Sequence, residues 1–341
     1  VCCKIGSCLY TGNMIIKDYA YGTFCIEEKV VKELLASKPL QRIKQISQQG
    51  LPAELDRSRP LNYSRYEHSV GVMLLLRKLG ANEEEQLAGL LHDISHTPFS
   101  HTADMLFGSY AEQGLQDSLH ESYFKNNEVE AILKRRGYDT SRISNPELFS
   151  LLERKSPDLC ADRLDYSLRD LAYVKQIDPK EEVRHLLNLN GEIVFDSEEH
   201  AIKYGKLFIY LEREFYANRD NIARRYAFAI ALKYALDKGI ISKEELLFGV
   251  DKDIINKIND SGIREITSIL NALRKDDFEV REGSLELKAK PRYVNPKFLD
   301  SGRISTAMEA SPSYRELVEN SIKEDTVGYR VKIRAGDVEI G

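Results

Sequence analysis

The spacing of apolar and polar residues predicts a chain built mainly from helices. Apolar side chains recur three and four positions apart, which places them along one face of a helix. Between residues 65 and 79 this face carries His68, Val72, Leu75 and Leu79. The same spacing predicts further helices over residues 28–49, 150–173 and 202–238.

Another predicted helix begins at a marked position. Asn82 has a side chain that can accept a hydrogen bond from the free N–H groups of a helix start, and Glu85 follows three residues later. Leucines continue at helical spacing until Pro98, which ends the pattern. His92 and His96 are four residues apart, so we expect them on one face of this helix.

Short stretches of alternating residues predict small β additions to the helical body. Residues 15–27 favour a hairpin around Gly22. Further short strands are expected at Glu192–Phe195, Leu285–Leu287 and Tyr329–Ile333. The expected fold is mainly α, with a helical core, small β-hairpins and a small α+β C-terminal region. We expect an N-terminal extension at 1–13, the core at 14–180 and the C-terminal region at 181–341.

Composition narrows the class of protein. The 341 residues carry a net charge of −5 and 42% are hydrophobic, which is typical of a globular chain and argues against broad binding to nucleic acid or an anionic membrane. No run of 18 apolar residues predicts a membrane-spanning helix, and the start lacks the zones of a signal peptide. Five cysteines, an odd number, favour a reducing compartment. We therefore expect a cytoplasmic protein.

Histidines gather in one part of the chain. Of the seven, five lie between positions 68 and 120: His68, His92, His96, His101 and His120. One histidine on a helix is usually a core or surface residue, but a cluster with carboxylates is what borderline divalent metals bind. The adjacent pair His92 and Asp93 offers a nitrogen and an oxygen ligand. Asp93 lies in an apolar stretch, where an unpaired carboxylate is costly and needs a cation or hydrogen-bond donors.

Further carboxylates occur later in the sequence. On the predicted helix, Asp162, Tyr166 and Asp170 share one face at intervals of four residues. An alternative interpretation is a solvated face with salt bridges to neighbouring arginines, which fits Asp165, and Tyr166 could equally be a core aromatic.

Taken together, these motifs resemble the HD-domain phosphohydrolases, whose pattern is His…His-Asp…Asp. The resemblance is strongest to the deoxynucleoside triphosphate triphosphohydrolase, or dGTPase-like, branch. It rests on Arg-Tyr-Glu-His upstream and on His-Asp-x-x-His-x-Pro-Phe-Ser-His. The supporting segments are 64–71, 89–101, 120–121 and 161–166, with weaker similarity at 40–48 and 218–226.

The resemblance implies a role for each matching residue. One divalent metal (manganese, magnesium, iron, nickel, cobalt or zinc) would be held by His68, His92, Asp93 and Asp162. The scissile phosphate would be surrounded by His96, His101 and His120, with Glu121 orienting a histidine. One of the histidines, His101 or His120, would protonate the leaving oxygen. Substrate would be contacted by Gln48, Arg65, Arg163, Tyr166 and Asp170.

The activity that the resemblance implies is hydrolysis of a deoxynucleoside triphosphate (dNTP) to a deoxynucleoside and triphosphate. Two alternatives remain open. One is a phosphatase or phosphodiesterase acting on nucleoside monophosphates or other phosphoesters, and the other is a non-catalytic, nucleotide-sensing oligomeric protein. Relatives commonly form homo-oligomers. Some also need a second, activating nucleotide, and Ala36 stands where those proteins carry an acidic residue.

Overall fold

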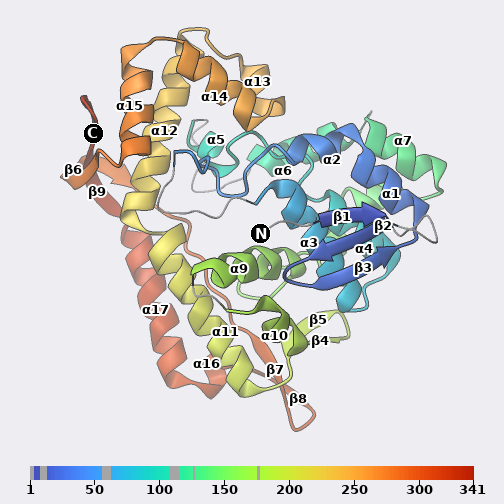
Figure 1. Ribbon diagram of the computed structural model, residues 1–341. Helices are drawn as coiled ribbons and strands as arrows, with labels where there is room; N and C mark the ends of the chain where they lie inside the picture. The colour runs from blue at the N-terminus through green and yellow to red at the C-terminus, as the bar shows by residue number, and fades with distance from the viewer. Residues whose placement is uncertain (1–3, 8–13, 56–62, 107–114, 126, 175–176) are drawn as a thin grey trace.

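The computed structural model describes residues 4–7, 14–55, 63–106, 115–125, 127–174 and 177–341, and its fold is mainly α-helical, as predicted (Figure 1). The N-terminal half contains β1 (Lys4–Ser7), β2 (Met14–Asp18), β3 (Gly22–Ile26), α1 (Lys29–Ala36), α2 (Lys38–Ile43), α3 (Arg65–Lys78), α4 (Glu83–Leu91), α5 (His101–Leu106), α6 (Leu115–Phe124), α7 (Glu128–Arg135), α8 (Thr140–Ile143), the short 3-10 helix η1 (Pro146–Leu148) and α9 (Ala161–Val174). The C-terminal half contains α10 (Pro179–Arg184), β4 (Leu186–Leu189), β5 (Glu192–Phe195), α11 (Glu198–Leu211), the π-helix η2 (Glu212–Tyr216), α12 (Arg219–Asp237), α13 (Lys243–Phe248), α14 (Asp251–Asp260), α15 (Arg264–Lys275), β6 (Phe278–Leu287), β7 (Lys297–Asp300), β8 (Arg303–Thr306), α16 (Ala307–Ala310), α17 (Pro312–Val327), β9 (Tyr329–Ala335) and β10 (Val338–Ile340).

Within the described residues, three small β-sheets accompany the helices. The predicted hairpin is present: β2 and β3 pair antiparallel, from Met14 opposite Ile26 to Asp18 opposite Gly22. β1, which lies in the stretch expected to be an extension, adds a third strand beside β2. The other two sheets have the strand orders β4-β5-β7-β8 and β10-β9-β6, and they include all three strands predicted in the C-terminal half.

Two of the predicted helices, α3 and α4, begin at a residue whose side chain caps the helix. The Ser64 side chain accepts from the Glu67 backbone and the Glu67 side chain accepts from the Ser64 backbone, which closes the start of α3. The Asn82 side chain accepts from the backbone N–H of Glu85 at the start of α4, as predicted. These two helices pack together, and α3 also packs on α9.

The end of α4 differs from the prediction. The helix stops at Leu91, and His92 to Ser95 form a turn, so His92 and His96 do not share a helix face. The Arg42 guanidinium donates to the carbonyls of Ile94 and His96 at 2.8 Å each, which helps to hold the segment after the helix in place.

Three longer predictions also need correction. The helix predicted over 28–49 is two helices, α1 and α2, separated by the extended residue Ser37, and the second ends at Ile43. Residues 150–160 are irregular and α9 begins only at Ala161. The helix predicted over 202–238 is interrupted by the π-helical segment η2, and α12 starts anew where the Asn218 side chain accepts from two backbone N–H groups. A polar cap at this position favours a new helix over continuation of the old one.

Two apolar cores hold the elements together, and both draw residues from either side of position 180. The larger joins α3, α4 and α9 to α11 and α17. The smaller surrounds α12, which packs beside α15 at the upper left of Figure 1, and includes Phe99 from the histidine-rich segment. Among the described residues, no helix is long and apolar enough to cross a membrane.

Candidate metal centre

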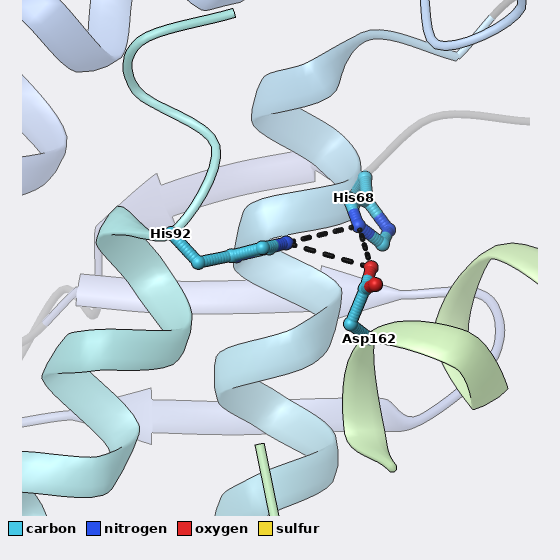
Figure 2. Close-up of side chains that lie close together, drawn as sticks. All are labelled: His68, His92 and Asp162. Atoms are coloured by element: carbon cyan, nitrogen blue, oxygen red, sulfur yellow. Dashed lines mark hydrogen bonds and ion pairs between the residues drawn. The ribbon is translucent and has the colours of Figure 1, made fainter. Parts of the chain in front are cut away.

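Three helices bring histidine and aspartate side chains to one point. His68 lies one turn into α3, His92 directly follows the end of α4, and Asp162 lies in the first turn of α9. Figure 2 shows the two imidazole rings and the Asp162 carboxylate pointing toward one another. Their ligand atoms all lie within 4.8 Å of one another, which is compatible with a shared metal ion. Asp93 follows His92 in the turn after α4.

The distances between the ligand atoms are short. His68 Nε2 lies 2.8 Å from Asp162 Oδ1 and 3.3 Å from His92 Nε2, and His92 Nε2 lies 3.5 Å from Asp162 Oδ1. The two oxygens of Asp93 lie 3.5 Å from His92 Nε2 and 3.7 Å from His68 Nε2. The structure thus brings together all four residues that the resemblance marks as ligands.

Hydrogen bonds behind the rings make the Nε2 atoms available. His68 Nδ1 lies 2.7 Å from Asp165 Oδ2, and His92 Nδ1 lies 2.8 Å from the carbonyl oxygen of Gly89. Both partners accept hydrogen bonds, so each ring keeps a proton on Nδ1, and Nε2 is the nitrogen that would bind an ion. Acceptors of this kind fix the tautomer and orientation of metal-binding histidines. The donor set fits one divalent ion.

The structure places Asp165 behind His68 at the site, whereas the sequence pattern favoured a position on the surface. The solvated face considered for it is wrong, because Asp165 is fully buried. Besides His68, it accepts from the Tyr21 hydroxyl at 2.7 Å and from Arg169 Nε at 2.8 Å, and Arg169 also donates to Asp18 at 2.9 Å. Arg169 is therefore committed to this buried network and does not face a substrate.

Asp93 has a second partner besides the histidines. Its Oδ2 accepts from Arg65 Nη1 at 2.7 Å, and both side chains are 5% exposed. Arg65 Nε also donates to Ser100 Oγ at 3.1 Å. Arg65, expected to contact substrate, lines the cleft but directs its guanidinium at Asp93. It balances the carboxylate charge that the sequence indicated would need a partner.

The charges of the cluster shift the pKa values of its members. Burial lowers the pKa of His68, but hydrogen bonds to Asp162 and Asp165 outweigh it and raise the pKa to about 9. Burial raises the pKa of Asp162, yet its bonds to His68 and His92 bring the pKa well below the usual range. The metal-free cluster therefore holds a proton that a bound metal must displace, so metal affinity falls as pH falls.

The three histidines that the resemblance places around the phosphate have different surroundings in the structure. His96 is buried, and its Nε2 lies 3.3 Å from Asp93 Oδ1. His120 Nδ1 lies 3.0 Å from Ser95 Oγ. Burial, and next the proximity of His92, lower the pKa of His120 to about 4. His101 begins α5, and its side chain lies outside the described residues.

Glu121 does not make the contact expected of it. It is exposed on α6 and forms an ion pair with Lys125 one turn later. Among the described side chains, no hydrogen bond joins Glu121 to a histidine. A role in orienting a histidine therefore has no support from the contacts of Glu121 in this structure.

Two cavities meet at the cluster. One, of about 470 Å³, is lined by His96 and by all five residues expected to contact substrate: Gln48, Arg65, Arg163, Tyr166 and Asp170. The other, of about 920 Å³, is lined by His92, His120 and Glu121. Asp93 and Asp162 line both, so the metal centre lies on the wall between them.

Asp170 is already well supplied with hydrogen bonds. Its Oδ1 accepts from Gln49 Nε2 at 2.8 Å and from the Tyr63 hydroxyl at 3.2 Å, and its Oδ2 accepts from the Tyr216 hydroxyl at 2.7 Å. It therefore fixes the wall of the cleft. Gln48 differs, since its Oε1 is buried without a hydrogen-bond partner among the residues that the structure describes.

Several cleft residues were missed from the sequence. Glu153 lines both cavities, and burial, followed by the charge of Asp162, raises its pKa to about 7. Glu212 lies in the π-helix η2, and burial raises its pKa to about 8. The segment 289–293 closes the cleft from the C-terminal half. None of these carries a motif, although a π-helical turn often marks a functional site.

Comparisons with known proteins agree with this geometry. The family model of the HD domain matches residues 65–165, which contain all four candidate ligands. The chain is 36% identical over 329 residues to the uncharacterised protein YdhJ of Bacillus subtilis, covering 94% of this chain and 99% of YdhJ. It is 32% identical over 223 residues to the metal-dependent phosphohydrolase cns2 of Cordyceps militaris, covering 63% of this chain and 64% of cns2.

Two solved structures share the fold. A phosphohydrolase from Bacteroides thetaiotaomicron superposes with a TM-score of 0.60 at 18% identity, covering 88% of this chain and 94% of that one. A hypothetical protein from Aquifex aeolicus gives 0.59 at 20% identity, covering 91% and 99%. The chain belongs to the HD-domain superfamily. Within it, the chain belongs to the same family as YdhJ. The relatives do not distinguish the dGTPase-like branch from others.

Proposed function

We propose that this chain is a metal-dependent phosphohydrolase that converts dNTPs to a deoxynucleoside and inorganic triphosphate. The observation that carries the proposal is the lining of the 470 Å³ cleft, where the carboxylates of the metal centre meet tyrosines and an excess of cationic side chains. The coarser activity, metal-dependent phosphate ester hydrolysis, is supported by the HD-domain match and by the relative cns2.

The cationic side chains support a substrate with several phosphates. Besides Arg65, the cleft is lined by Arg154, Lys155, Arg163, Arg225, Lys290 and Arg292. Outside the metal centre its acidic residues are Glu153, Asp170 and Glu212, and burial holds the pKa of two of these near or above neutral. A monophosphate needs fewer positive partners than a triphosphate does.

The tyrosines support a nucleoside. Tyr63, Tyr166 and Tyr216 line the cleft, and the rings of Tyr166 and Tyr216 meet edge to face at 6.0 Å. Such faces provide stacking surface for a base or sugar. Gln48 adds a buried oxygen in need of a donor, which a sugar hydroxyl can supply.

The mechanism follows from the groups around the phosphate. His68, His92, Asp93 and Asp162 would hold the ion, which on binding lowers the pKa of a coordinated water and polarises a phosphate oxygen. His120, held by Ser95, is neutral near pH 7 in the free protein. His120 lines the larger cavity, so a phosphate bound across the metal centre would reach it, raise its pKa and let the ring take up a proton and donate it to the leaving oxygen.

Product analysis tests the proposal. Purified protein with Mn²⁺ is incubated with each dNTP and, separately, with each deoxynucleoside monophosphate, and the phosphorus products are resolved by ³¹P NMR. Inorganic triphosphate from the dNTPs is expected. Asp162→Asn should abolish turnover, whereas the exposed Asp237→Asn should not. Phosphate release from monophosphates with dNTPs untouched would favour a phosphatase, and nucleotide-dependent assembly without turnover would favour a sensor.

A further inference from the structure

A second group of histidine and aspartate side chains lies in the C-terminal half and lines neither cavity of the metal centre. His185 follows α10, Asp196 follows β5, and His200 lies in the first turn of α11. One ligand atom from each lies within 4.8 Å of the other two. We propose that these three residues bind a second divalent ion of the borderline class, such as Zn²⁺, independently of the catalytic centre.

The three side chains gather around one carboxylate. Asp196 Oδ2 lies 2.8 Å from His185 Nδ1, and Asp196 Oδ1 lies 3.1 Å from His200 Nδ1. The two imidazole rings stack with centroids 3.4 Å apart at an angle of 19°, so one ring must turn before both nitrogens can bind one ion in the planes of their rings. Two imidazole nitrogens and one carboxylate form a set that Zn²⁺ commonly binds, with a fourth position left for water.

Backbone hydrogen bonds hold the three positions in place before any ion arrives. The Asp196 N–H donates to the His185 carbonyl at 2.9 Å. This bond lies one residue pair beyond Leu186 opposite Phe195, where the antiparallel pairing of β4 with β5 ends. The Ser197 side chain caps α11 by accepting from the His200 backbone N–H at 3.4 Å. Binding an ion therefore orders little additional chain, which lowers the entropic cost of binding.

The charges of the group also favour a cation. Among the described residues, the ion-pair partners of Asp196 are His185 and His200. Protonating both rings would stack two positive charges face to face, whereas a divalent ion replaces both protons with one centre of charge. Glu198 and Glu199 are exposed in the same helical turn and add negative charge. A competing contact exists, because Ser197 Oγ lies 2.8 Å from His200 Nδ1; a turn of the imidazole ring breaks it and leaves Ser197 as the cap of α11.

The site is open enough to exchange its ion. The side chains of His185, His200 and Asp196 are 29%, 25% and 39% exposed. A bound ion would thus keep contact with solvent, and equilibrium methods can measure its affinity. The proposal concerns occupancy and does not depend on which substrate the catalytic centre hydrolyses.

Metal stoichiometry tests the site. In the full-length protein, His92→Ala with Asp162→Asn removes two ligands of the catalytic centre. This variant is dialysed against micromolar Zn²⁺, and bound zinc is measured by mass spectrometry. We expect one equivalent to remain, and addition of His200→Ala to remove it. Failure of the double variant to retain zinc, or equal retention after His200→Ala, would overturn the proposal.

Two further variants test whether a loss of zinc binding reflects a lost ligand or a lost fold. Asp196→Asn keeps the shape of the side chain and should weaken zinc binding at least tenfold, while Glu199→Gln, a carboxylate on the same turn, should leave it unchanged. Substitution with Co²⁺ provides a second readout, because three protein ligands and water give the visible absorption of a four-coordinate ion. The same spectrum in Asp196→Asn would also contradict the assignment.

Discussion

Replacing Asp165 with asparagine removes the charge behind the first histidine of the catalytic metal centre. In the wild type, Asp165 accepts from His68 Nδ1 at 2.7 Å and from Arg169 Nε at 2.8 Å. Arg169 and hydrogen bonding to His68 counter the effect of burial and lower the pKa of Asp165, so it is a carboxylate when His68 binds metal. An asparagine amide has no charge with which to make the imidazole more basic.

The substitution should have two effects, one on metal affinity and one on stability. Loss of a partner behind a ligand histidine typically weakens metal binding about 10- to 100-fold, which corresponds to about 1.4–2.7 kcal/mol. Removing one partner of a buried ion pair typically costs about 3–5 kcal/mol of stability. Arg169 keeps Asp18 as a second partner at 2.9 Å, so the loss should fall near the lower end.

Asp18→Asn is the matched control. Asp18 pairs with the same arginine and is equally buried, but among the described contacts it has none to His68. Both variants should lose stability in urea unfolding, whereas only Asp165→Asn should lose affinity in a calorimetric Mn²⁺ titration. Saturating Mn²⁺ should restore much of its turnover. Unchanged affinity in folded Asp165→Asn, or an equal loss in Asp18→Asn, would refute the reasoning.

Three other predictions concern packing, pH and the ion. Gly71→Ala should cost about 1–3 kcal/mol in urea unfolding, because a Cβ there would collide with Arg169 and Asp165; unchanged stability would contradict the packing. Burial raises the folded-state pKa of Glu212 to about 8. The free energy of unfolding of the wild type should therefore fall as pH rises from about 4.5 to 8. Across that window, Glu212→Gln should gain up to about 5 kcal/mol of stability relative to the wild type. A pH-independent difference would refute this. Removing Mn²⁺ by dialysis should lower wild-type stability by about 2.7 kcal/mol relative to protein in metal at 100 times Kd and leave Asp162→Asn unaffected, as thermal unfolding can check.

The sequence predicted which side chains gather at the site better than it predicted their surroundings. The resemblance marked His68, His92, Asp93 and Asp162 as candidate ligands, and the structure brings all four together. The caps at Ser64 and Asn82 lie within four residues of the groups they satisfy, and local signals of this kind can be read from sequence.

What the sequence could not give depends on contacts between distant segments. The segment after α4 is held by Arg42, which lies about fifty positions earlier and donates to the carbonyls of Ile94 and His96. Arg65 was expected to face substrate, but Asp93, 28 residues later, engages it. Asp165 appeared to be a surface residue from its arginine neighbours, and only the packing of β2 and α9 on α3 buries it.

One carboxylate in the C-terminal half supports residues next to the candidate metal centre. Asp251, the first residue of α14, accepts from the backbone N–H of Ser47 at 2.8 Å and of Phe99 at 2.9 Å. Phe99 and Ser100 have positive φ angles of 59° and 45°, a conformation that costs non-glycine residues about 1 kcal/mol or more each. Phe99 is held there by Asp251, and Ser100 then accepts from Arg65, the partner of Asp93. The orientation of a metal ligand thus depends on a residue almost 160 positions further along the chain, beyond the segment that matches the HD domain.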